Sequence, residues 1–566
     1  EVPSATQIPA RMVALTRPFS GIAGSLAVRS RSDPFRLALS LVFQPVAAQL
    51  RRRFSWVAIS ARLHSSKASS GANGSVENPS PAGGVEHQHG LPTLPRRRGG
   101  ASVFVTLPVD AVGSTGQMSR RKTMAASFVA LKAAGVEGVA VEVWWGIVER
   151  DVPGVYNWAG YVDLVSLARR HGLKVRTIMA FHHSGSGPGD PCWASLPQWV
   201  VEEIDLDPDL VYSDRFGRRS KEYISLGCDI LPVLKGRTPI QAYSDFMRNF
   251  RDTFREFLGS TITEVQVGMG PAGELRYPSR ANGVPELGGF QCYDKYMLAS
   301  LNACAKNVGK NALGIGGPLH AGILFQNSEE TNSLECGDSW DTTYIHFFLE
   351  WYSEMLLLHG ERLCMAADAI FWGTGVMVLA KVAAVHWHYS TNSHPSELTA
   401  GYYNTLTRDG YLPIARLFSR YRMTLCCACF DIRDAEVEQV NPKSSPEGVL
   451  RQLVYAARMC NLPLTGENTV TRLDDASLKQ VVKSSKLYKD HLYAHSLSFN
   501  FVRMNKNLFE SHNWTRFTRF VRQMSDARTF QAKLDMGSSV LCLPSTSGSD
   551  AIGRARIFKK LLLVLH

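Results

Sequence analysis

The sequence predicts an α/β protein built as one parallel (β/α)8 barrel of the TIM type, with long loops on the face where the strands end. From residue 103 onward, strand-like runs alternate with amphipathic helical stretches, which is typical of a parallel sheet with crossover helices. Several runs are largely apolar, as strands buried on both faces should be. The eight runs are residues 103–109, 138–145, 173–182, 262–269, 313–318, 381–389, 423–430 and 464–468.

Helical periodicity fills most of the intervals between these runs, and the alternation favours a barrel over an open sheet. Two connections, after the third and fourth runs, are roughly 20 residues or more longer than usual. We expect them to build a substrate cleft at the carboxyl ends of the strands. The helical stretches are residues 121–134, 160–171, 240–257, 340–359, 412–421, 446–460 and 474–487.

Composition divides the chain into four parts. Residues 1–75 are rich in Ser and Arg and poor in acids, which is typical of an organelle transit peptide. Residues 76–101 form a linker with too little apolar surface to fold. The barrel occupies residues 102–526. Residues 527–566 show no periodic pattern, and we expect a disordered or spurious extension there.

The net charge of +12 belongs mostly to the ends of the chain. Residues 1–100 carry 13 Lys or Arg against 4 acids, and residues 527–566 carry 6 against 2. The remainder is close to neutral, so the high pI is no argument for a nucleic-acid partner. The chain lacks a run of 18 apolar residues, and we therefore expect no membrane span.

Eleven cysteines, an odd and scattered number, favour a reducing compartment over a disulfide framework. Cys426 and Cys429 have the spacing of a redox or zinc pair, but no second pair accompanies them. We interpret them as buried core thiols. A redox sensor is the weaker alternative.

Two glutamates are the candidates for catalysis. Glu274 ends a glycine-rich turn within the stretch 268–278, at the end of the fourth strand-like run, and Glu467 lies in the eighth run. Carboxylates at the ends of two well-separated barrel strands would flank the mouth of the barrel, as glycoside hydrolysis requires. For Glu274 alone, a surface glutamate in a tight turn is the simpler interpretation.

Other polar and aromatic residues accompany this pair. Trp144 and Trp145 are either sugar platforms or barrel-core aromatics, and the sequence leaves both open. A metal site is disfavoured because the histidines lack a paired acidic motif. The histidines in question are His182, His183, His386 and His388.

The motifs around these residues resemble those of the plant β-amylases, a starch-acting glycoside hydrolase family, over about residues 102–525. Long matches make the resemblance specific. They include Glu222-Tyr-Ile-Ser-Leu-Gly, Gly270-Pro-Ala-Gly-Glu-Leu-Arg-Tyr-Pro, Phe290-Gln-Cys-Tyr-Asp-Lys-Tyr, Glu397-Leu-Thr-Ala-Gly-Tyr-Tyr-Asn and Gly466-Glu-Asn.

The resemblance implies a (β/α)8 barrel that removes maltose from the non-reducing ends of α-1,4-glucans with inversion, in the chloroplast stroma. It implies no cofactor and no metal, and α-1,4-glucan or maltose as the partner. Glu274 would be the general acid and Glu467 the general base. Substrate-binding positions would be Glu142, His182, Asp190, Lys381, His386, Ala428, Asn468 and Arg503.

Three positions depart from the family pattern within the site. Glu142 replaces an aspartate, Pro188 lies in the lid segment, and Ala428 replaces a threonine whose hydroxyl would contact substrate. A longer side chain, a stiffer lid and a lost hydrogen bond would each weaken catalysis. The alternative is therefore a catalytically weak or silent glucan-binding regulator of starch breakdown that acts through other starch-degrading enzymes.

Overall fold

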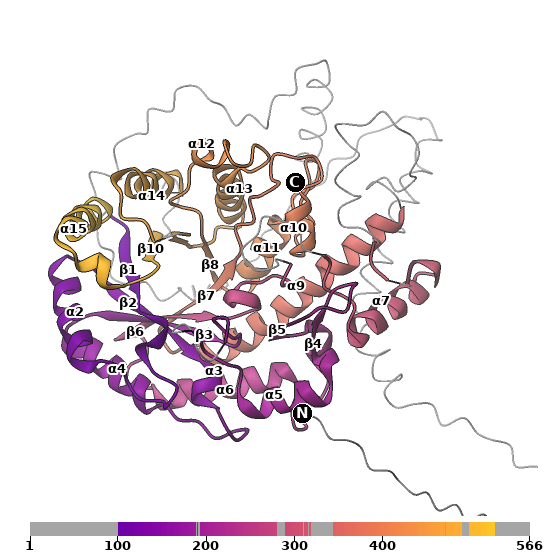
Figure 1. Ribbon diagram of the computed structural model, residues 1–566, viewed down its shortest axis with the longest axis horizontal. Coiled ribbons are helices and arrows are strands. Elements are labelled where there is room, and N and C mark those ends of the chain that lie inside the picture. The colour runs from indigo at the N-terminus through magenta and orange to yellow at the C-terminus, as the bar shows by residue number, and fades with distance from the viewer. Residues whose placement is uncertain are drawn as a thin grey trace, which may run out of the picture.

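Eight parallel strands close into a barrel in the computed structural model (Figure 1). The structure describes residues 100–187, 190, 193–279, 289–309, 311–314, 316–318, 343–469, 471–488 and 497–526. Around the barrel the strands follow the order β1, β10, β9, β8, β7, β6, β3 and β2. Their bounds are β1 Ser102–Thr106, β2 Gly138–Trp144, β3 Lys174–Ala180, β6 Ile262–Val267, β7 Met377–Val382, β8 Thr424–Cys427, β9 Leu464–Glu467 and β10 Leu497–Phe501.

Six of the eight predicted strands are confirmed, and a seventh is displaced. The predicted run 381–389 overlaps β7 only at its first two residues, because the strand begins at Met377 and the histidine-containing segment follows it as turns. Leu464–Glu467 is the seventh barrel strand rather than the eighth, because one predicted strand was wrong and another was missed.

The wrong prediction is the run 313–318. Its first two residues belong to a 3-10 helix, Asn311–Gly314, and residues 316–318 are not in a strand. Three glycines and a proline within six residues disfavour a strand. The missed strand is β10, in which Ser498 and Asn500 alternate with buried apolar residues. Polar residues that face the barrel interior gave it the pattern of a half-exposed strand.

Helices surround the strands in Figure 1. All seven predicted helical stretches are confirmed, although α9 is longer than expected, and α5 (Gln198–Leu206), α7 (Lys295–Asn307) and α15 are among the helices that were not predicted. The helix α6 shows why its boundary was predictable, since Thr238 and Gln241 form a capping box in front of Pro239. The main helices are α2 Arg121–Ala133, α4 Ala159–Arg170, α6 Pro239–Thr253, α9 Thr343–Phe371, α11 Leu412–Arg420, α13 Pro446–Met459, α14 Asp475–Tyr488 and α15 Ser511–Ser525.

The last helix closes the barrel domain against its first strand. The backbone N–H of Ala101 donates to the carbonyl oxygen of Met524 at 2.7 Å. Figure 1 shows α15 beside β1. None of the described helices is both long and apolar enough to cross a membrane. The predicted transit peptide, nearly all of the linker and the extension 527–566 lie outside the described residues, so they stay predictions.

The long connections after the third and fourth strands are confirmed. The first contains α5, Gln198–Leu206, and an antiparallel hairpin of β4, Val211–Ser213, and β5, Arg219–Ile224. The second contains α7, Lys295–Asn307, and leads into α9. The hairpin supports the turn that carries Glu274, because Glu222 Oε1 accepts a hydrogen bond from the N–H of Ala272 at 2.8 Å.

The interior of the barrel is polar on the side that lies below the candidate site. Arg176 on β3 donates through Nε to Glu264 on β6, and both side chains are almost fully buried. Arg176 Nη2 also reaches Ser498 Oγ at 3.1 Å, and Ser498 is 2.8 Å from Thr465 Oγ1. This buried ion pair fixes the relative positions of β3, β6, β9 and β10 directly under the strand ends.

Candidate active site

Glu274 is held by a turn whose backbone few sequences can adopt. Ala272 and Gly273 have φ values of 53° and 73°, in the left-handed region that favours glycine. Beyond the turn, the chain runs beside β7, and the N–H of Leu275 donates to the carbonyl oxygen of Lys381 at 2.9 Å. The glutamate is therefore positioned by backbone contacts on both sides. The simpler interpretation, a freely solvated surface glutamate, is wrong, since the side chain is only 15% exposed.

Two cations contact the carboxylate of Glu274. Arg276 Nε donates to Oε2 at 2.8 Å, and the Lys381 ammonium lies 3.5 Å from Oε1. Arg276 was not among the predicted site residues, although it stands inside the motif that carries Glu274. Its spacing of two residues along an extended segment places both side chains on the same side of the chain.

Glu467 ends β9 with its side chain buried in the barrel mouth. Lys381 Nζ lies 2.9 Å from Oε2, and Asn500 Nδ2 donates to Oε1 at 2.8 Å. Burial alone would raise the pKa of Glu467. The charge of Lys381 and the hydrogen bonds from Asn500 and Lys381 outweigh burial, so the pKa lies below its usual value. Glu467 is therefore ionised at neutral pH.

Lys381 joins the two glutamates. Burial would lower its pKa, but the charges of Glu467 and Glu274 raise it well above its usual value, and the ammonium keeps its proton. Both predicted catalytic residues thus contact one side chain from β7, one of the two strands that lie between β6 and β9. The prediction that the two carboxylates share the barrel mouth is supported by these contacts.

A second ion pair lies at the ends of β2 and β10. Arg503 binds Glu142 with two hydrogen bonds, of 2.9 and 2.5 Å, and also donates to the carbonyl oxygen of Leu107 at 2.8 Å. The two predicted binding residues therefore contact each other. The Glu142 side chain, which is longer than the aspartate of the family pattern, binds the guanidinium through both carboxylate oxygens, in two parallel hydrogen bonds.

His182 follows β3 and is buried against Trp144, with ring centroids 5.3 Å apart. Burial lowers the pKa of His182 to about 3, aided by His183, Lys381 and Arg276, so the imidazole is neutral at physiological pH. Its Nδ1 has no hydrogen-bond partner among the described residues. Because Nδ1 is itself shielded from solvent, a sugar hydroxyl would have to bind the other ring nitrogen, Nε2.

Two further predicted binding residues have well-defined hydrogen bonds. His386 Nδ1 is 2.8 Å from Ser444 Oγ, and its ring stacks on Trp387. Asn468 exchanges two hydrogen bonds with the backbone of Val502, which ties the end of β9 to the end of β10.

Two others lie in loops above the strands. Asp190 Oδ2 accepts from the N–H and hydroxyl of Ser186, at 2.9 and 3.1 Å, and thereby closes a turn in the lid segment. The structure describes no contact between Asp190 and the two glutamates. Pro188 lies outside the described residues. Ala428 precedes Cys429, whose φ of 68° marks a sharp bend directly after β8.

The structure places one of the two tryptophans and one of the four histidines. Trp145 is a core aromatic, buried edge-on against Trp199 with ring centroids 5.6 Å apart. His388 donates to or accepts from Ser396 Oγ at 2.6 Å and is a satisfied polar residue.

Cys426 and Cys429 are buried free thiols, as predicted. Burial raises the pKa of both, which disfavours the thiolate that redox chemistry requires. The structure thus gives no support to the redox-sensor alternative.

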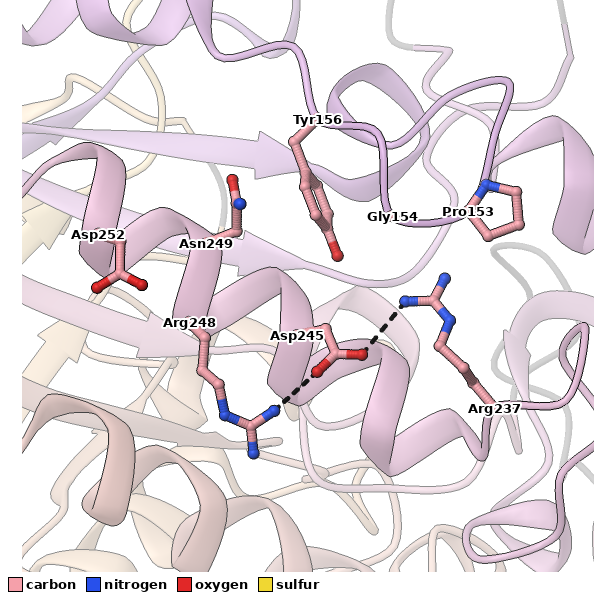
Figure 2. A pocket seen from close by; sticks show the side chains of 8 residues that line it. All are labelled: Pro153, Gly154, Tyr156, Arg237, Asp245, Arg248, Asn249 and Asp252. Carbon is pink, nitrogen blue, oxygen red and sulfur yellow. Dashed lines mark hydrogen bonds and ion pairs between the residues drawn. The ribbon is translucent and has the colours of Figure 1, made fainter.

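A cavity of about 420 Å3 lies away from these residues, between the loop after α3 (Trp145–Val148) and α6 (Figure 2). None of the predicted site residues lines it. Its charged groups already have partners, since Arg237 pairs with Glu149 at 2.6 Å and Arg248 with Asp245 at 2.7 Å. The lining residues are Pro153, Gly154, Tyr156, Arg237, Asp245, Arg248, Asn249 and Asp252.

Comparison with known proteins identifies the family. The profile described as glycosyl hydrolase family 14 matches residues 104–529. The chain belongs to glycosyl hydrolase family 14. "Beta-amylase 1, chloroplastic" of Arabidopsis thaliana is 50% identical over 440 residues, which is 76% of each chain. "Inactive beta-amylase 4, chloroplastic" of the same plant is 40% identical over 439 residues, 75% of this chain and 82% of the relative.

A solved structure supports the fold independently. The catalytic domain of the β-amylase from Paenibacillus polymyxa superposes with a TM-score of 0.62 at 20% identity, covering 75% of this chain and 98% of that one. The family and the barrel predicted from the motifs are therefore confirmed.

The contacts of Lys381 generate a first prediction. Lys381→Met should lower the free energy of unfolding at pH 7 by about 3 kcal/mol, because it leaves the buried carboxylate of Glu467 without its contacting cation. Glu467, whose folded pKa is low, contributes stability above its unfolded pKa of about 4.3 and loses it as the pH falls. In the variant, Glu467 stays buried without its cation, which raises its pKa, so the deficit should shrink as the pH falls from that raised pKa toward the low folded pKa of the unmodified protein.

Calorimetric melting of both proteins between pH 4 and 8 measures this deficit. Lys295→Met is the matched control, because Lys295 pairs with Asp207 at the surface and is 49% exposed. Its effect should stay below about 1 kcal/mol. A pH-independent deficit in Lys381→Met would contradict the electrostatic interpretation.

Proposed function

We propose that the protein is an inverting exo-hydrolase that releases maltose from the non-reducing ends of α-1,4-glucans. The observation that carries the proposal is the pair of glutamates at the barrel mouth, joined by the Lys381 ammonium at 3.5 and 2.9 Å. Family membership supplies the reaction class, and two carboxylates are what glycoside hydrolysis requires.

In the proposed reaction, Glu274 is the general acid. It gives its proton to the glycosidic oxygen as the bond from that oxygen to the anomeric carbon breaks. Glu467 is the general base, and it takes a proton from a water molecule that attacks the anomeric carbon from the opposite face. The product therefore has inverted configuration. The low pKa of Glu467 supports its role as base, since a base must be ionised before the reaction.

The remaining predicted residues would bind the glucan. His182 offers a neutral imidazole, and His386, Asp190 and Asn468 offer hydrogen-bonding groups at the rim. Glu142 and Arg503 would have to share their mutual hydrogen bonds with sugar hydroxyls. We propose no cofactor and no metal, because two carboxylates and water complete the reaction.

Relatives with a chloroplast name support a plastid location, and we propose the stroma. The Ser- and Arg-rich residues 1–75 would be the transit peptide that directs the protein there. Starch-derived chains are the α-1,4-glucans available in that compartment.

The second candidate function is a catalytically weak or silent glucan-binding regulator. Two observations favour it: each oxygen of the Glu142 carboxylate already accepts a hydrogen bond from Arg503, and Ala428 offers no hydroxyl. A 40% identical relative is named as inactive. Such a protein would bind the same glucans and act through other starch-degrading enzymes.

Maltose release from soluble starch tests the main proposal. Glu274→Gln and Glu467→Gln should each lower kcat by at least about a thousandfold, because each removes one proton-transfer step. Glu256→Gln is the matched control, since Glu256 is an exposed surface residue. If the unmodified protein releases no maltose while maltodextrin still raises its Tm, the regulator is the correct function.

Ala428 gives a gain-of-function prediction. Ala428→Thr should raise kcat/KM for maltodextrins about fivefold, as one hydrogen bond of about 1 kcal/mol would. Ala428→Val adds nearly the same volume without the hydroxyl, and it should not raise the rate. Equal effects of the two substitutions would show that volume, and not hydrogen bonding, limits catalysis at this position.

A further inference from the structure

One buried amide in the barrel mouth belongs to no motif and to none of the predicted site residues. Asn500 lies on β10, between β1 and β9, and the sheet register pairs it with Phe104 on one side and Glu467 on the other. Its side chain is fully buried. A buried polar group needs partners, and those of Asn500 can be described completely.

Both ends of this amide are engaged. Nδ2 donates to Glu467 Oε1 at 2.8 Å, and Oδ1 accepts from the hydroxyl of Thr106 on β1 at 3.1 Å. An ionised carboxylate only accepts hydrogen bonds, so the NH2 end must face Glu467. Thr106 is itself buried and fills the acceptor at the other end.

We propose that Asn500 is a positioning residue that aims the Glu467 carboxylate at the attacking water and keeps it ionised, with Thr106 orienting the amide. This inference rests on the proposed role of Glu467 as general base. It adds a chain of side-chain hydrogen bonds that runs from Thr106 on β1 through Asn500 on β10 to Glu467 on β9, the proposed general base.

The geometry explains why one contact matters. Lys381 holds Oε2 of Glu467 and Asn500 holds Oε1, so two donors from opposite sides fix the plane of the carboxylate. Lys381 also contacts Glu274. Without Asn500, the glutamate would be free to rotate about its remaining contact with the ammonium. A shift of about 1 Å in a reacting group can lower the rate about a hundredfold.

The charges that face Glu467 come from other strands. They are Lys381 on β7, the carboxylate of Glu274 that shares this ammonium and, farther away, Arg176 on β3. Cys426 and Cys427 on β8 are neutral thiols whose pKa values are raised by burial. Asn500 is the neutral donor among the groups that contact the carboxylate. A negative charge at position 500 would therefore act on Glu467 directly.

Asn500→Asp tests the proposal, because it keeps the size of the side chain and replaces the donor with an acceptor. We expect the acid limb of the kcat/KM profile to move up by about one pH unit or more, since Glu467 then faces a like charge. We expect kcat to fall about tenfold to a hundredfold and KM to change less than about threefold.

Asn404→Asp is the matched control. Asn404 is also fully buried, and its Nδ2 donates to the carboxylate of Glu397 at 3.0 Å. The substitution makes the same chemical change away from the two glutamates, so it should affect stability and leave the acid limb in place. An acid limb that moves equally in both variants, or in neither, would overturn the proposal.

A double-mutant cycle on thermal stability tests the contact between Asn500 and Glu467 without an activity measurement. The Tm loss from Asn500→Asp should be larger in the unmodified protein than in a Glu467→Gln background, where the like charge is absent. The repulsion exists only while both carboxylates are ionised, so the difference should shrink as the pH falls through the raised folded pKa of the coupled pair in the variant. Equal Tm losses in both backgrounds would refute the coupling.

The two failures can be told apart. If the unmodified protein releases no maltose, the proposed reaction is wrong, and the stability cycle still shows whether Asn500 holds Glu467. If Asn500→Asp does not fold, Thr106→Val replaces it, because it removes only the donor to Oδ1. Its Tm loss should be smaller and likewise depend on Glu467, and a loss that is independent of Glu467 would count against the proposal.

Discussion

The ammonium of Lys381 between two carboxylates is the interaction on which the site depends. Glu274 and Glu467 come from segments almost 200 residues apart, and like charges of this kind repel in a buried mouth. A single cation on β7 allows both to be present and sets the space between them. Because this cation is fixed in the barrel wall, the pair does not depend on a mobile loop.

The barrel supports this arrangement from below. The ion pair of Arg176 and Glu264 lies deeper in the interior, and Arg176 also contributes to the low pKa of Glu467. Polar side chains then continue upward along β10, through Ser498 and Asn500. These polar groups become buried together when the barrel folds. Each is stabilised in the interior by its hydrogen bonds or ion pairs with the others. These buried ion pairs and hydrogen bonds restrict the side chains, so the proposed catalytic groups are held in fixed positions.

The ion pair of Glu142 and Arg503 bears on both proposed functions, the active hydrolase and the weak or silent regulator. A carboxylate that is held by two hydrogen bonds offers less to a sugar hydroxyl than a free one. In the active interpretation, the glucan shares these hydrogen bonds. In the regulatory interpretation, the ion pair of Glu142 and Arg503 stays intact and Ala428 supplies no hydroxyl. Both features lower the rate of hydrolysis while the barrel still binds glucan. Both interpretations use the same scaffold, as a fold does not determine activity.

Much of this architecture could be predicted from the sequence, because barrel strands buried on both faces leave a clear apolar signal. The prediction failed where that signal was absent. The strand β10 carries Ser498 and Asn500 toward the interior and was missed, whereas the glycine-rich run 313–318 was wrongly assigned.

Glu274 and Glu467 were predicted as the catalytic pair from their places at the ends of strands. The contact of Glu142 with Arg503 joins residues 361 positions apart and has no local sign in the sequence. Asn500 was missed for the same reason, since its role depends on a neighbouring strand.

The configuration of the first product tests the central claim most directly. Proton NMR can follow the anomeric signals of maltose released from maltopentaose within the first minutes, before mutarotation mixes them. Two carboxylates that act as acid and base on opposite faces predict β-maltose as the first product. Initial release of α-maltose would mean retention of configuration, and it would contradict the roles assigned to Glu274 and Glu467.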